Sequence, residues 1–382
     1  MSVLFVTNGH GEVAIAARIA RELSGVTCDH LALVGDFAHP SVMRDVGPRK
    51  AMPSGGLVAM GNVRNIARDV AAGLVAHTIA QLRFTRSVRG QYETAVAVGD
   101  VFALIVAFTA KARSTIFVGT AKSVHHAPYG PVEERIIAKA RKVFVRDFAT
   151  AARLRDRGVL ADPANVIVDL YSDEERGRFG ASFDTTVAVF PGSRDTAYAD
   201  AIDLTRIVRE AAKAHAGLGG ALSIAPGLDV ARFADGFARD GWRVTDRGDA
   251  RTPFSLYDGE REVVRAWRGD PGAILAGASV ALGQAGTANE AAAAGGIPVV
   301  AYERSGAPSN AWYRARQAGL LGDALTIVSG DAMQAAQELL ALLDDAQRRE
   351  RMGRIGRERM GPPGGAKLIA GSILATAAGV RA

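Results

Sequence analysis

Apolar residues along the chain gather in short runs that alternate with longer stretches in which they recur every three or four positions. Residues 2–7 and 186–190 are compact apolar runs, and each is followed by a glycine-containing turn. Residues 13–23 then carry Ile15 and Ile19 at helical spacing. Strands that alternate with helices form right-handed βαβ units with parallel strands. The pattern therefore predicts an α/β protein built on parallel sheets.

The first half of the chain is expected to hold one such sheet with helices between its strands. The predicted strands are 2–7, 30–35, 93–98, 115–118, 142–145 and 166–169. The predicted helices are 13–23, 61–89 with a break near Gly73, 101–110, one opened by Pro131, and one that runs from 146 to 157. Because residues 101–110 are apolar almost throughout, we expect that helix to be buried.

The second half restarts the same pattern after a polar, glycine-containing stretch. The predicted strands are 186–190, 221–224, 242–245, 262–267, 279–282, 297–301 and 325–328. The predicted helices are 197–216, 271–277, 288–294, 308–317, 331–343, 347–357 and 364–378. We therefore predict an N-terminal domain at 1–170, a linker at 171–185 and a C-terminal domain at 186–363. The apolar helix within 364–382 is expected to cross back to the N-terminal domain.

Composition narrows the class of protein. The length of 382 residues suits two domains, and the single cysteine, Cys28, excludes an intramolecular disulfide framework and a cysteine-based zinc cluster. No apolar run is long enough to span a bilayer, and the chain begins directly with a strand, so we expect a cytoplasmic protein without a signal peptide. The formal net charge of +6 favours anionic partners, although an arginine- and alanine-rich composition explains it equally well.

The stretch from Gly283 to Glu290 carries the clearest candidate chemistry, because it forms the turn between a strand and a helix. Its glycines allow a ligand to approach the backbone closely, and the free N–H groups that begin the helix suit a phosphate. Glu290 would repel a phosphate, but it can accept hydrogen bonds from sugar hydroxyls beside one. A diphosphate joined to a polyol, such as a nucleotide sugar, fits this pattern. The alternative is an ordinary βαβ turn in which Glu290 only complements the helix dipole.

A second turn follows the strand at 186–190. Its residues include Gly192, Ser193 and Arg194. Ser193 and the neighbouring backbone N–H groups are suited to hold a phosphate that Arg194 neutralises. The alternative is a simple turn with a surface arginine.

The first turn of the chain, Asn8-Gly9-His10-Gly11-Glu12, supports two interpretations. Gly9-x-Gly11-x-x-Ala14, with Asp36 near the end of the second strand, matches a dinucleotide fingerprint. Against it, His10 and Glu12 place polar side chains where a pyrophosphate needs a small turn.

Asp100 ends the strand at 93–98, at the edge where parallel sheets bind ligands. It also suits the N-cap of the helix that follows, and the two roles are compatible. Two adjacent histidines, His125 and His126, have no third ligand nearby in the sequence and are not expected to bind metal.

The helical region 61–89 mixes apolar residues with arginines, among them Arg68, Arg83, Arg86 and Arg89. A basic amphipathic face of this kind can lie on an anionic membrane, which would bring the protein to the inner face of the cytoplasmic membrane. The alternative is a solvated arginine face on a helix that packs into the core.

Three motifs together resemble the lipid-A-disaccharide synthase family, in particular its lipid-A-disaccharide synthase-related branch. They are Asn8-Gly9-His10-Gly11-Glu12, Pro191-Gly192-Ser193-Arg194 and Gly286-Thr287-Ala288-Asn289-Glu290, and Val145-Arg146-Asp147 and 359–364 add to the likeness. The resemblance implies a GT-B fold, in which two Rossmann-like domains with parallel sheets face a central cleft. It further implies inverting, metal-independent transfer of a hexose or N-acetylhexosamine from a UDP-sugar, with no cofactor beyond that donor.

The resemblance also implies roles for particular residues. Glu290 would hold the ribose, and Gln317 would approach the donor sugar. The diphosphate would be held by Gly192, Ser193, Arg194, Gly286, Thr287 and Ala288. Asp100 only loosely matches the region of the family's base, so Asp100, Glu12 and His10 are all candidates. The Gly-His-Gly-Glu turn departs from the small, acidic turn of the synthase, which leaves a lipid-linked or another glycan acceptor open. Nucleic acid is not an expected partner.

Three other functions fit the same residues. A UDP-N-acetylglucosamine 2-epimerase shares the expected fold and needs no acceptor. An NAD-dependent oxidoreductase would use Gly9, Gly11, Ala14 and Asp36. A non-catalytic protein would bind a sugar nucleotide or serve as a membrane scaffold without turning it over.

Overall fold

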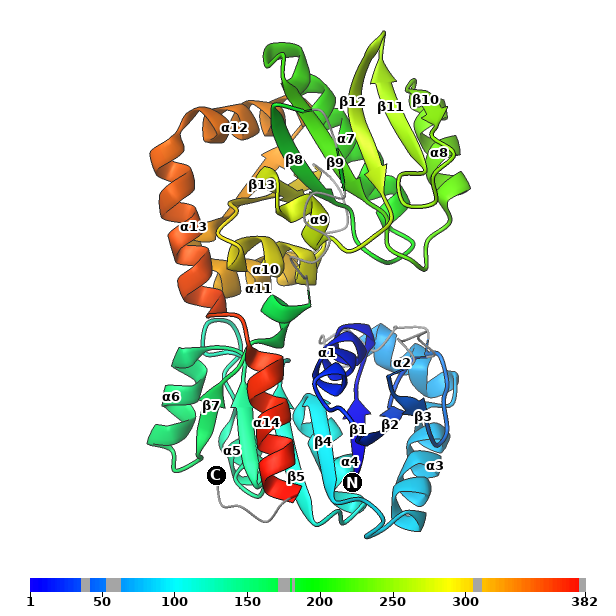
Figure 1. The fold of residues 1–382 in the computed structure, drawn as a ribbon, viewed down its shortest axis with the longest axis vertical. Helices are drawn as coiled ribbons and strands as arrows, with labels where there is room; N and C mark the ends of the chain where they lie inside the picture. Colours follow the sequence, from blue (N-terminus) through cyan, green and yellow to red (C-terminus); the bar gives the residue numbers. More distant parts are fainter. Residues whose placement is uncertain (36–41, 53–62, 171–178, 181–182, 305–310, 378–382) are drawn as a thin grey trace. The chain divides into compact units, whose positions relative to one another are not determined.

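The computed structural model describes residues 1–35, 42–52, 63–170, 179–180, 183–304 and 311–377. The side chains of residues 10, 63–66, 304, 311–313 and 377 lie outside this description. The chain divides into two compact units, each with its own sheet (Figure 1). Unit 1 comprises Met1–Leu170 and Gly361–Ala382, and unit 2 comprises Tyr171–Met360. Within the described residues, none of the helices has the length and apolar character needed to cross a bilayer.

Unit 1 is built on a seven-stranded parallel sheet, which confirms the predicted sheet type. The strand order is β3-β2-β1-β4-β5-β6-β7. The strands are β1 (Ser2–Thr7), β2 (Thr27–Ala32), β3 (Arg44–Asp45), β4 (Thr94–Gly99), β5 (Ser114–Gly119), β6 (Lys142–Val145) and β7 (Ala161–Pro163). Every neighbouring pair in this sheet is parallel. The chain thus extends outward from β1 in one direction and from β4 in the other.

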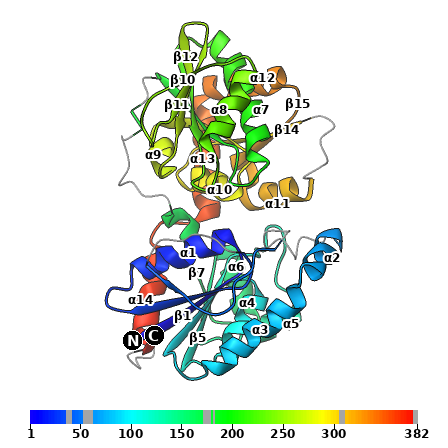
Figure 2. The same cartoon turned by 90° about the vertical axis from the view of Figure 1, so that its right-hand side faces the viewer.

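Helices cover both faces of this sheet because successive strand residues point to opposite sides. Val3 and Phe5 pack with α1 (His10–Arg21) and α14 (Gly365–Ala377). Leu4 and Val6 belong to the cluster that packs with α3 (Leu74–Ser87), α4 (Val101–Thr109), α5 (Pro131–Ile137) and α6 (Phe148–Asp156). Figure 2 shows α1 and α14 on one side of the sheet and α3, α4 and α5 on the other.

Three sequence predictions in unit 1 have distinct outcomes. The break near Gly73 is confirmed, because this residue has a left-handed φ of 93° between α2 (Val63–Ala71) and α3. The strand predicted at 166–169 is wrong: Val166–Asp169 is a 3-10 helix, begun by Asn165, whose side chain accepts a hydrogen bond from the Ile167 N–H. The helix predicted to be buried is only partly so, since Phe102 and Ile105 of α4 are 40% and 41% exposed.

Unit 2 contains an eight-stranded sheet in the order β10-β11-β12-β9-β8-β13-β14-β15. Its strands are β8 (Thr185–Phe190), β9 (Leu218–Ser223), β10 (Arg243–Asp246), β11 (Phe254–Asp258), β12 (Arg261–Trp267), β13 (Ala278–Gly283), β14 (Val299–Arg304) and β15 (Leu325–Gly330). The six strands from β12 to β15 in this order are parallel, as predicted. β10 and β11 add an antiparallel edge that the sequence did not predict. The turn between β11 and β12 contains Gly259, whose φ of +61° favours glycine.

The helices of unit 2 also lie on both faces of its sheet. They are α7 (Ala197–Ala214), α8 (Val230–Arg239), α9 (Gly272–Leu275), α10 (Gly286–Ala294), α11 (Ala311–Leu321), α12 (Ala332–Asp344) and α13 (Ala346–Met360), with a 3-10 turn at Gly322–Ala324. Leu204 and Ile207 of α7, Phe233 of α8 and Leu339 of α12 share one core cluster with Val187 and Val189 of β8. α10 packs against α13.

Two glycines let α13 approach the end of α10 at backbone distance. A Cβ on Gly356 would lie 2.4 Å from the Ala293 carbonyl oxygen, and one on Gly353 would lie 2.3 Å from that of Gly296. We expect Gly356→Ala to destabilise unit 2 by about 1–3 kcal/mol, because backbone atoms cannot yield to the added methyl group. Urea unfolding followed by tryptophan fluorescence measures this, since Trp242, Trp267 and Trp312 all belong to unit 2.

Gly236 of α8 provides the matched control for this prediction. A Cβ there would meet only the Ile202 Cδ1 atom, at an ordinary contact distance of 3.6 Å. Gly236→Ala is expected to be neutral or stabilising by up to about 1 kcal/mol, since alanine favours helix over glycine. Equal urea midpoints for the two variants would contradict the tight packing of α13 on α10.

Candidate functional site

The candidate ligand-binding turns of unit 2 lie beside each other at the point in the sheet from which the strand order runs outward in two opposite directions. From β8 the chain proceeds through α7 to β9, and from β13 it proceeds through α10 to β14 on the other side. β8 and β13 are neighbours, so the turns after them lie side by side at the carboxyl edge. The Phe190 carbonyl oxygen accepts hydrogen bonds from the Gln284 N–H at 2.8 Å and the Ala285 N–H at 3.2 Å. Open α/β sheets bind their ligands at such a switch point.

The N-terminal end of α10 points its backbone N–H groups to this edge. Ala285 occupies the N-cap with extended backbone angles and makes no side-chain cap hydrogen bond. The first N–H groups of a helix have no partner within the helix, and here the N-cap side chain is a methyl group. The segment Gly286-Thr287-Ala288 therefore begins the helix with N–H groups that suit an anion, and its part in holding a diphosphate stays a prediction.

Asn289 and Gly283 hold the end of β13 against the first turns of α10. The Asn289 side chain is fully buried, and its Nδ2 donates to the Gly283 carbonyl oxygen at 3.1 Å. A Cβ on Gly283 would lie 2.0 Å from Asn289 Oδ1, so only glycine fits there. Glu290 follows as the fifth residue of α10 and is 7% exposed. Its carboxylate is thus largely enclosed beside the helix end.

The turn after β8 is the exposed part of this site. Ser193 and Arg194 are both exposed. Gly192 adopts a φ of +119°, and a Cβ there would meet nothing within 4 Å. The structure therefore brings this turn to the same edge as the α10 end and leaves its side chains accessible to a ligand.

Gln317 lies behind the α10 end. Its side chain is 2% exposed. Oε1 accepts a hydrogen bond from Arg314 Nη1 at 2.9 Å, and Nε2 donates to the Ala285 carbonyl oxygen at 3.2 Å. Both ends of the amide are thus engaged within the protein, and the side chain contacts the turn that precedes α10.

Unit 1 has its own switch point, between β1 and β4, and two candidate residues meet there. Asn8 follows β1 and Asp100 follows β4, and Asn8 Nδ2 donates to Asp100 Oδ2 at 2.8 Å. Asp100 Oδ1 accepts from the Ala103 N–H at 3.0 Å, which confirms Asp100 as the N-cap of α4. Both carboxylate oxygens of Asp100 therefore accept hydrogen bonds from the protein.

Glu12, in the first turn of α1, lies at the same edge. Its Oε1 accepts from Thr120 Oγ1 at 3.3 Å, at the end of β5. Two glycines make room for it: a Cβ on Gly99 would lie 3.3 Å from Glu12 Cγ, and one on Gly9 would lie 2.9 Å from Oε2. Their φ values of 132° and 143° also favour glycine. The structure thus brings Glu12 and Asp100 to one edge, and both are partly exposed.

Neighbouring buried groups surround this edge. Arg146, which is 5% exposed, donates from Nη1 to the Thr120 carbonyl oxygen at 3.1 Å. Burial raises the pKa of the Tyr129 hydroxyl well above its usual range, and the nearby Glu133 carboxylate adds to this effect. A Cβ on Gly119 would lie 2.4 Å from that hydroxyl. Sequence reasoning missed Thr120, although its place directly after an apolar strand is the signal that singled out Asp100.

Two candidate residues of unit 1 cannot be placed from the described side chains. The backbone of His10 begins α1, but its side chain is not among the described residues. Asp36, the residue predicted to hold a ribose in the dinucleotide interpretation, falls in 36–41. The Glu12 carboxylate occupies the space above Gly9, where a pyrophosphate would have to approach the backbone. Like charges repel there, which disfavours the dinucleotide interpretation.

A metal site is not evident in the described part of the chain. No three histidine, cysteine, aspartate or glutamate side chains come together there in a way that could hold an ion. The expectation of a metal-independent site stays a prediction.

Solved structures with this fold include both sugar transferases and epimerases. A calicheamicin glycosyltransferase matches with a TM-score of 0.60 and 15% identity, over 98% of each chain. A putative UDP-N-acetylglucosamine 2-epimerase from Listeria monocytogenes matches with a TM-score of 0.58 and 14% identity, over 98% of this chain and 96% of that chain. The UDP-N-acetylglucosamine 2-epimerase from Neisseria meningitidis bound to UDP-GlcNAc matches with a TM-score of 0.54 and 13% identity, over 98% and 100%.

The comparisons extend over the full length of these chains but are limited to structure. No family model matches the sequence, and no curated protein matches it. At these identities the likeness establishes the fold, which is the predicted GT-B type with two Rossmann-like units. The predicted likeness to lipid-A-disaccharide synthase in particular, and the cleft predicted between the units, stay predictions.

Proposed function

We propose that this protein transfers a sugar from a UDP-sugar to the hydroxyl group of an acceptor, with inversion at the anomeric carbon and without a metal. The observation that carries this proposal is the pair of switch points. One joins the end of α10 to the turn at Ser193 and Arg194, and the other holds the carboxylates of Glu12 and Asp100. The first arrangement suits a diphosphate, and the second suits a proton acceptor.

In the proposed reaction, a carboxylate of unit 1 takes the proton from the acceptor hydroxyl. The acceptor oxygen forms a bond to C1 of the sugar while the bond from C1 to the β-phosphate oxygen breaks. The bonding electrons leave with UDP. Arg194 and the N–H groups at the start of α10 offset the negative charge that develops on the diphosphate, and they do so most strongly when that charge is largest.

Glu12 fits the role of the base better than Asp100. Both Asp100 oxygens accept hydrogen bonds from Asn8 and from the start of α4, so this carboxylate holds the two loops together. Glu12 Oε1 accepts a hydrogen bond from the Thr120 hydroxyl at 3.3 Å, and the Glu12 side chain packs closely over Gly9 and Gly99. Protonation of Asp100 would weaken hydrogen bonds that hold Asn8 and the start of α4, which disfavours Asp100 as the base. We therefore place Glu12 first and treat Asp100 as the group that positions Asn8.

The outer surface of α3, α4 and α5 supports a lipid-linked acceptor. Exposed apolar side chains occur on all three helices: Val75, Ile79, Phe102, Ile105 and Val132. Exposed basic residues accompany them, and these are Arg83, Arg86, Arg89, Arg135 and Lys139. We call these ten residues the helical face. Thr85 and Thr109 share a hydrogen bond of 2.6 Å at the C-terminal ends of α3 and α4.

The hydrogen bond between the two helix ends fixes the relative positions of the exposed residues along α3 and α4. Ile79 and Phe102 are each about two turns before the paired threonines, so they lie at roughly equal heights on the two helices. Phe102 is also two positions from Asp100. The apolar part of the helical face is thus close to the edge that carries the proposed base, as an acceptor held in a membrane would require. The side chains of residues 63–66, which belong to the basic helical region predicted at 61–89, lie outside the description.

We expect the protein to sediment with vesicles that contain about 30% anionic lipid, and more weakly as salt is raised. Replacing Ile79 and Phe102 together by aspartate should weaken this binding roughly tenfold or more, because apolar area and local charge are both lost. The matched control is Leu160→Asp, since Leu160 is 84% exposed and lies outside the helical face. An equal loss in the control, or equal binding to neutral vesicles, would exclude the helical face as a lipid contact.

A 2-epimerase is the second candidate, because two of the structural neighbours described above carry that name. Such an enzyme would change the configuration at C2 of the sugar without any acceptor. A transferase would release UDP only when an acceptor is present. Incubation with UDP-N-acetylglucosamine, with and without a lipid extract, followed by chromatography of sugars and nucleotides separates the two. UDP release that depends on the lipid extract supports the transferase proposal. Formation of the C2 epimer without the lipid extract would instead show that the protein is an epimerase.

Nucleotide binding is the first experiment for either candidate. A ligand that binds only the folded state raises the melting temperature, and the shift grows with the logarithm of its concentration relative to Kd. We expect UDP and UDP-sugars to raise it more than ADP, GDP or NAD. If NAD raised the melting temperature and UDP did not, both candidate functions would be wrong and the dinucleotide interpretation would be favoured.

A further inference from the structure

Unit 2 contains a cavity of about 280 Å³ at the amino edge of its sheet. Its walls are the start of β13, the segment 296–298 that leads from α10 into β14, and one side of α13. Because β13 and β14 are parallel, α10 runs from the carboxyl edge, where the proposed donor site lies, back to the amino edge. The cavity is therefore at the other end of α10, and the proposed function does not use it.

Two arginines of α13 border this cavity, with a glycine midway between them. Arg349, Gly353 and Arg357 are each four positions apart, so they follow one ridge of the helix. Because Gly353 has no side chain, the ridge leaves a gap between the two arginines. The backbone of α13 approaches the segment after α10 at this gap, since a Cβ on Gly353 would lie 2.3 Å from the Gly296 carbonyl oxygen.

Neither guanidinium forms an ion pair with any residue that the structure describes. Arg349 Nη1 donates to the Leu342 carbonyl oxygen at 3.0 Å, near the end of α12. The Arg357 guanidinium occupies the space that a Cβ on Gly296 would need, just after the end of α10. Carbonyl groups at helix ends carry only partial negative charge. These contacts therefore leave most of the positive charge of both arginines for a ligand.

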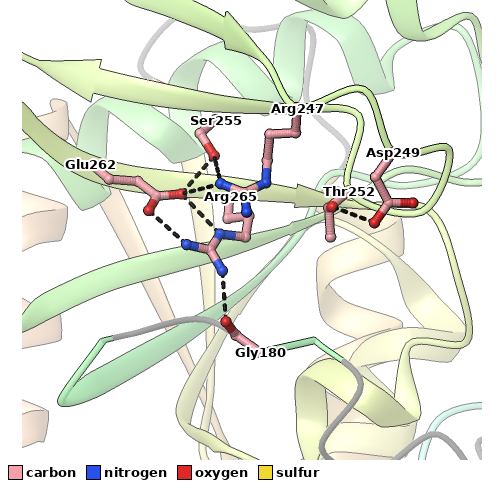
Figure 3. A network of polar contacts seen from close by, with 7 residues as sticks. All are labelled: Gly180, Arg247, Asp249, Thr252, Ser255, Glu262 and Arg265. Carbon is pink, nitrogen blue, oxygen red and sulfur yellow. Dashed lines mark hydrogen bonds and ion pairs between the residues drawn. The ribbon is translucent and has the colours of Figure 1, made fainter.

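Other arginines of unit 2 have their charge matched within the protein. Arg265 is nearly buried, and it donates from Nη2 to Glu262 Oε2 at 2.7 Å and from Nη1 to the Gly180 carbonyl oxygen at 2.7 Å (Figure 3). Arg247 Nη1 lies 3.8 Å from Oε1 of the same carboxylate. The arginines of α13 that border the cavity differ from this network, because they face an open space and have no such carboxylate.

A hydroxyl group enters the cavity from the sheet. The pairing of β13 with β8 shifts its register between Ala278 and Val280, so Ser279 is the additional residue of a β-bulge. A bulge changes the direction of a side chain at the edge of a sheet. Ser279 lines the cavity, and its hydroxyl forms no hydrogen bond with a described residue. The cavity thus has donors on two different walls.

We propose that this cavity binds a small phosphate monoester, whose phosphate is held by the guanidinium groups of Arg349 and Arg357 and by the hydroxyl of Ser279. Arginine binds phosphate through charge-assisted hydrogen bonds, and a tetrahedral anion offers acceptor oxygens to donors on separate walls. The inference does not depend on the proposed function, because it concerns another ligand at another edge of the sheet.

Size and charge limit the ligand further. The volume is slightly below the range of about 300–1,000 Å³ in which drug-sized ligands bind, so a sugar phosphate fits better than a nucleotide sugar. Among the described residues that line the cavity, Glu350 alone is acidic, and it is exposed. Its carboxylate repels a second phosphate, which favours a ligand with one phosphate group over a diphosphate.

The test uses glucose 6-phosphate as the probe. Glucuronate provides a carboxylate of similar size, and glucose is the uncharged control. In calorimetric titrations we expect the wild type to bind glucose 6-phosphate with a Kd of about 1 mM or lower, glucuronate more weakly, and glucose not at all. Arg349→Gln and Arg357→Gln should each weaken the binding of glucose 6-phosphate by about tenfold. Ser279→Ala should weaken it by about threefold, since it removes one neutral hydrogen-bond donor.

Arg351→Gln is the matched control, because it makes the same charge change at an exposed position of α13 that does not line the cavity. It should bind glucose 6-phosphate as the wild type does. Melting temperatures show whether each variant folds, and the exposed position of Arg357 keeps Arg357→Gln informative if Arg349→Gln is unstable. The inference is overturned if the wild type does not bind glucose 6-phosphate, if Arg357→Gln binds it as well as the wild type, if Arg351→Gln loses as much affinity as Arg357→Gln, or if glucuronate binds equally well.

A second series of titrations, in saturating UDP, separates the cavity from the proposed donor site. Because that site lies at the other end of α10, UDP should leave the affinity for glucose 6-phosphate within about twofold. Competition between the two ligands would place the phosphate at the start of α10 and overturn the inference. If UDP itself does not bind, the proposed function is wrong, and the titrations without UDP still decide whether the cavity binds a phosphate monoester.

Discussion

Glu12→Gln should reduce turnover by about 10²- to 10⁴-fold, the range by which a positioned general base accelerates a proton transfer. The amide keeps the size of the side chain and can still accept a hydrogen bond from Thr120 Oγ1, which lies 3.3 Å from Oε1 in the wild type. It cannot take up the acceptor proton. Because the proposed nucleotide site lies in unit 2, the affinity for UDP should not change. Initial rates of UDP release at saturating donor, together with UDP titrations, measure the two quantities.

Two variants serve as controls for this experiment. Glu22→Gln changes the glutamate that follows the same helix, where it pairs with Arg18, and should retain full turnover. Asp100→Asn should have a smaller effect than Glu12→Gln, since asparagine can still cap α4 and only the contact with Asn8 is lost. If Asp100→Asn abolishes turnover while Glu12→Gln retains it, the base is Asp100 and the order proposed above is reversed.

Glu290→Gln should weaken UDP binding by about 10- to 100-fold, because hydrogen bonds to a charged partner contribute roughly 1.5–3 kcal/mol. Glu290 is 7% exposed on the second turn of α10, so a carboxylate lies close to the proposed diphosphate site without facing bulk water. Sugar hydroxyls can donate to it, whereas the phosphates cannot. The wild type should therefore prefer UDP over 2′-deoxy-UDP or 3′-deoxy-UDP, and the variant should lose that preference. Calorimetric titration with the three nucleotides provides the measurement.

Glu350→Gln, a change at an exposed position of α13, is the control for this prediction. It should leave the discrimination between ribose and deoxyribose intact. If Glu290→Gln lowers the affinity for all three nucleotides by the same factor, Glu290 supports the helix and does not contact the ribose. Thermal unfolding without ligand separates that outcome from a general loss of stability.

The local chemistry of both switch points was predictable from the sequence. Short apolar runs end at Thr7, Gly99, Phe190 and Gly283, and each is followed by a turn with a residue able to bind a ligand or a proton. The period of apolar residues reports which face of a strand or helix is buried, and glycines report where the backbone turns or is approached closely. Those signals are local, and they singled out Glu12, Asp100, the turn at Ser193 and the end of α10 as candidates.

Some elements were missed because their sequence signals are weak or ambiguous. β11 lies in an antiparallel edge that interrupts the expected alternation of strand and helix. Val166–Asp169 is as apolar as a strand, but the Asn165 side chain turns the backbone into a 3-10 helix. The apolar residues Phe102 and Ile105 belong to a continuous apolar stretch that is typical of a buried helix. They are exposed because α4 covers one face of the sheet and its outer side is left uncovered.

By itself the sequence determined the α/β class, the two successive sheets, and the turns that could hold a diphosphate and a base. Only the tertiary structure decided which turns meet: Asn8 and Asp100 are 92 positions apart, and Gln317 reaches Ala285 across 32. Strand order brings such residues together, and strand order depends on packing among distant segments that no local period records. For the same reason, only the fold showed that both carboxylate oxygens of Asp100 accept hydrogen bonds and that Gln317 donates to the Ala285 carbonyl oxygen.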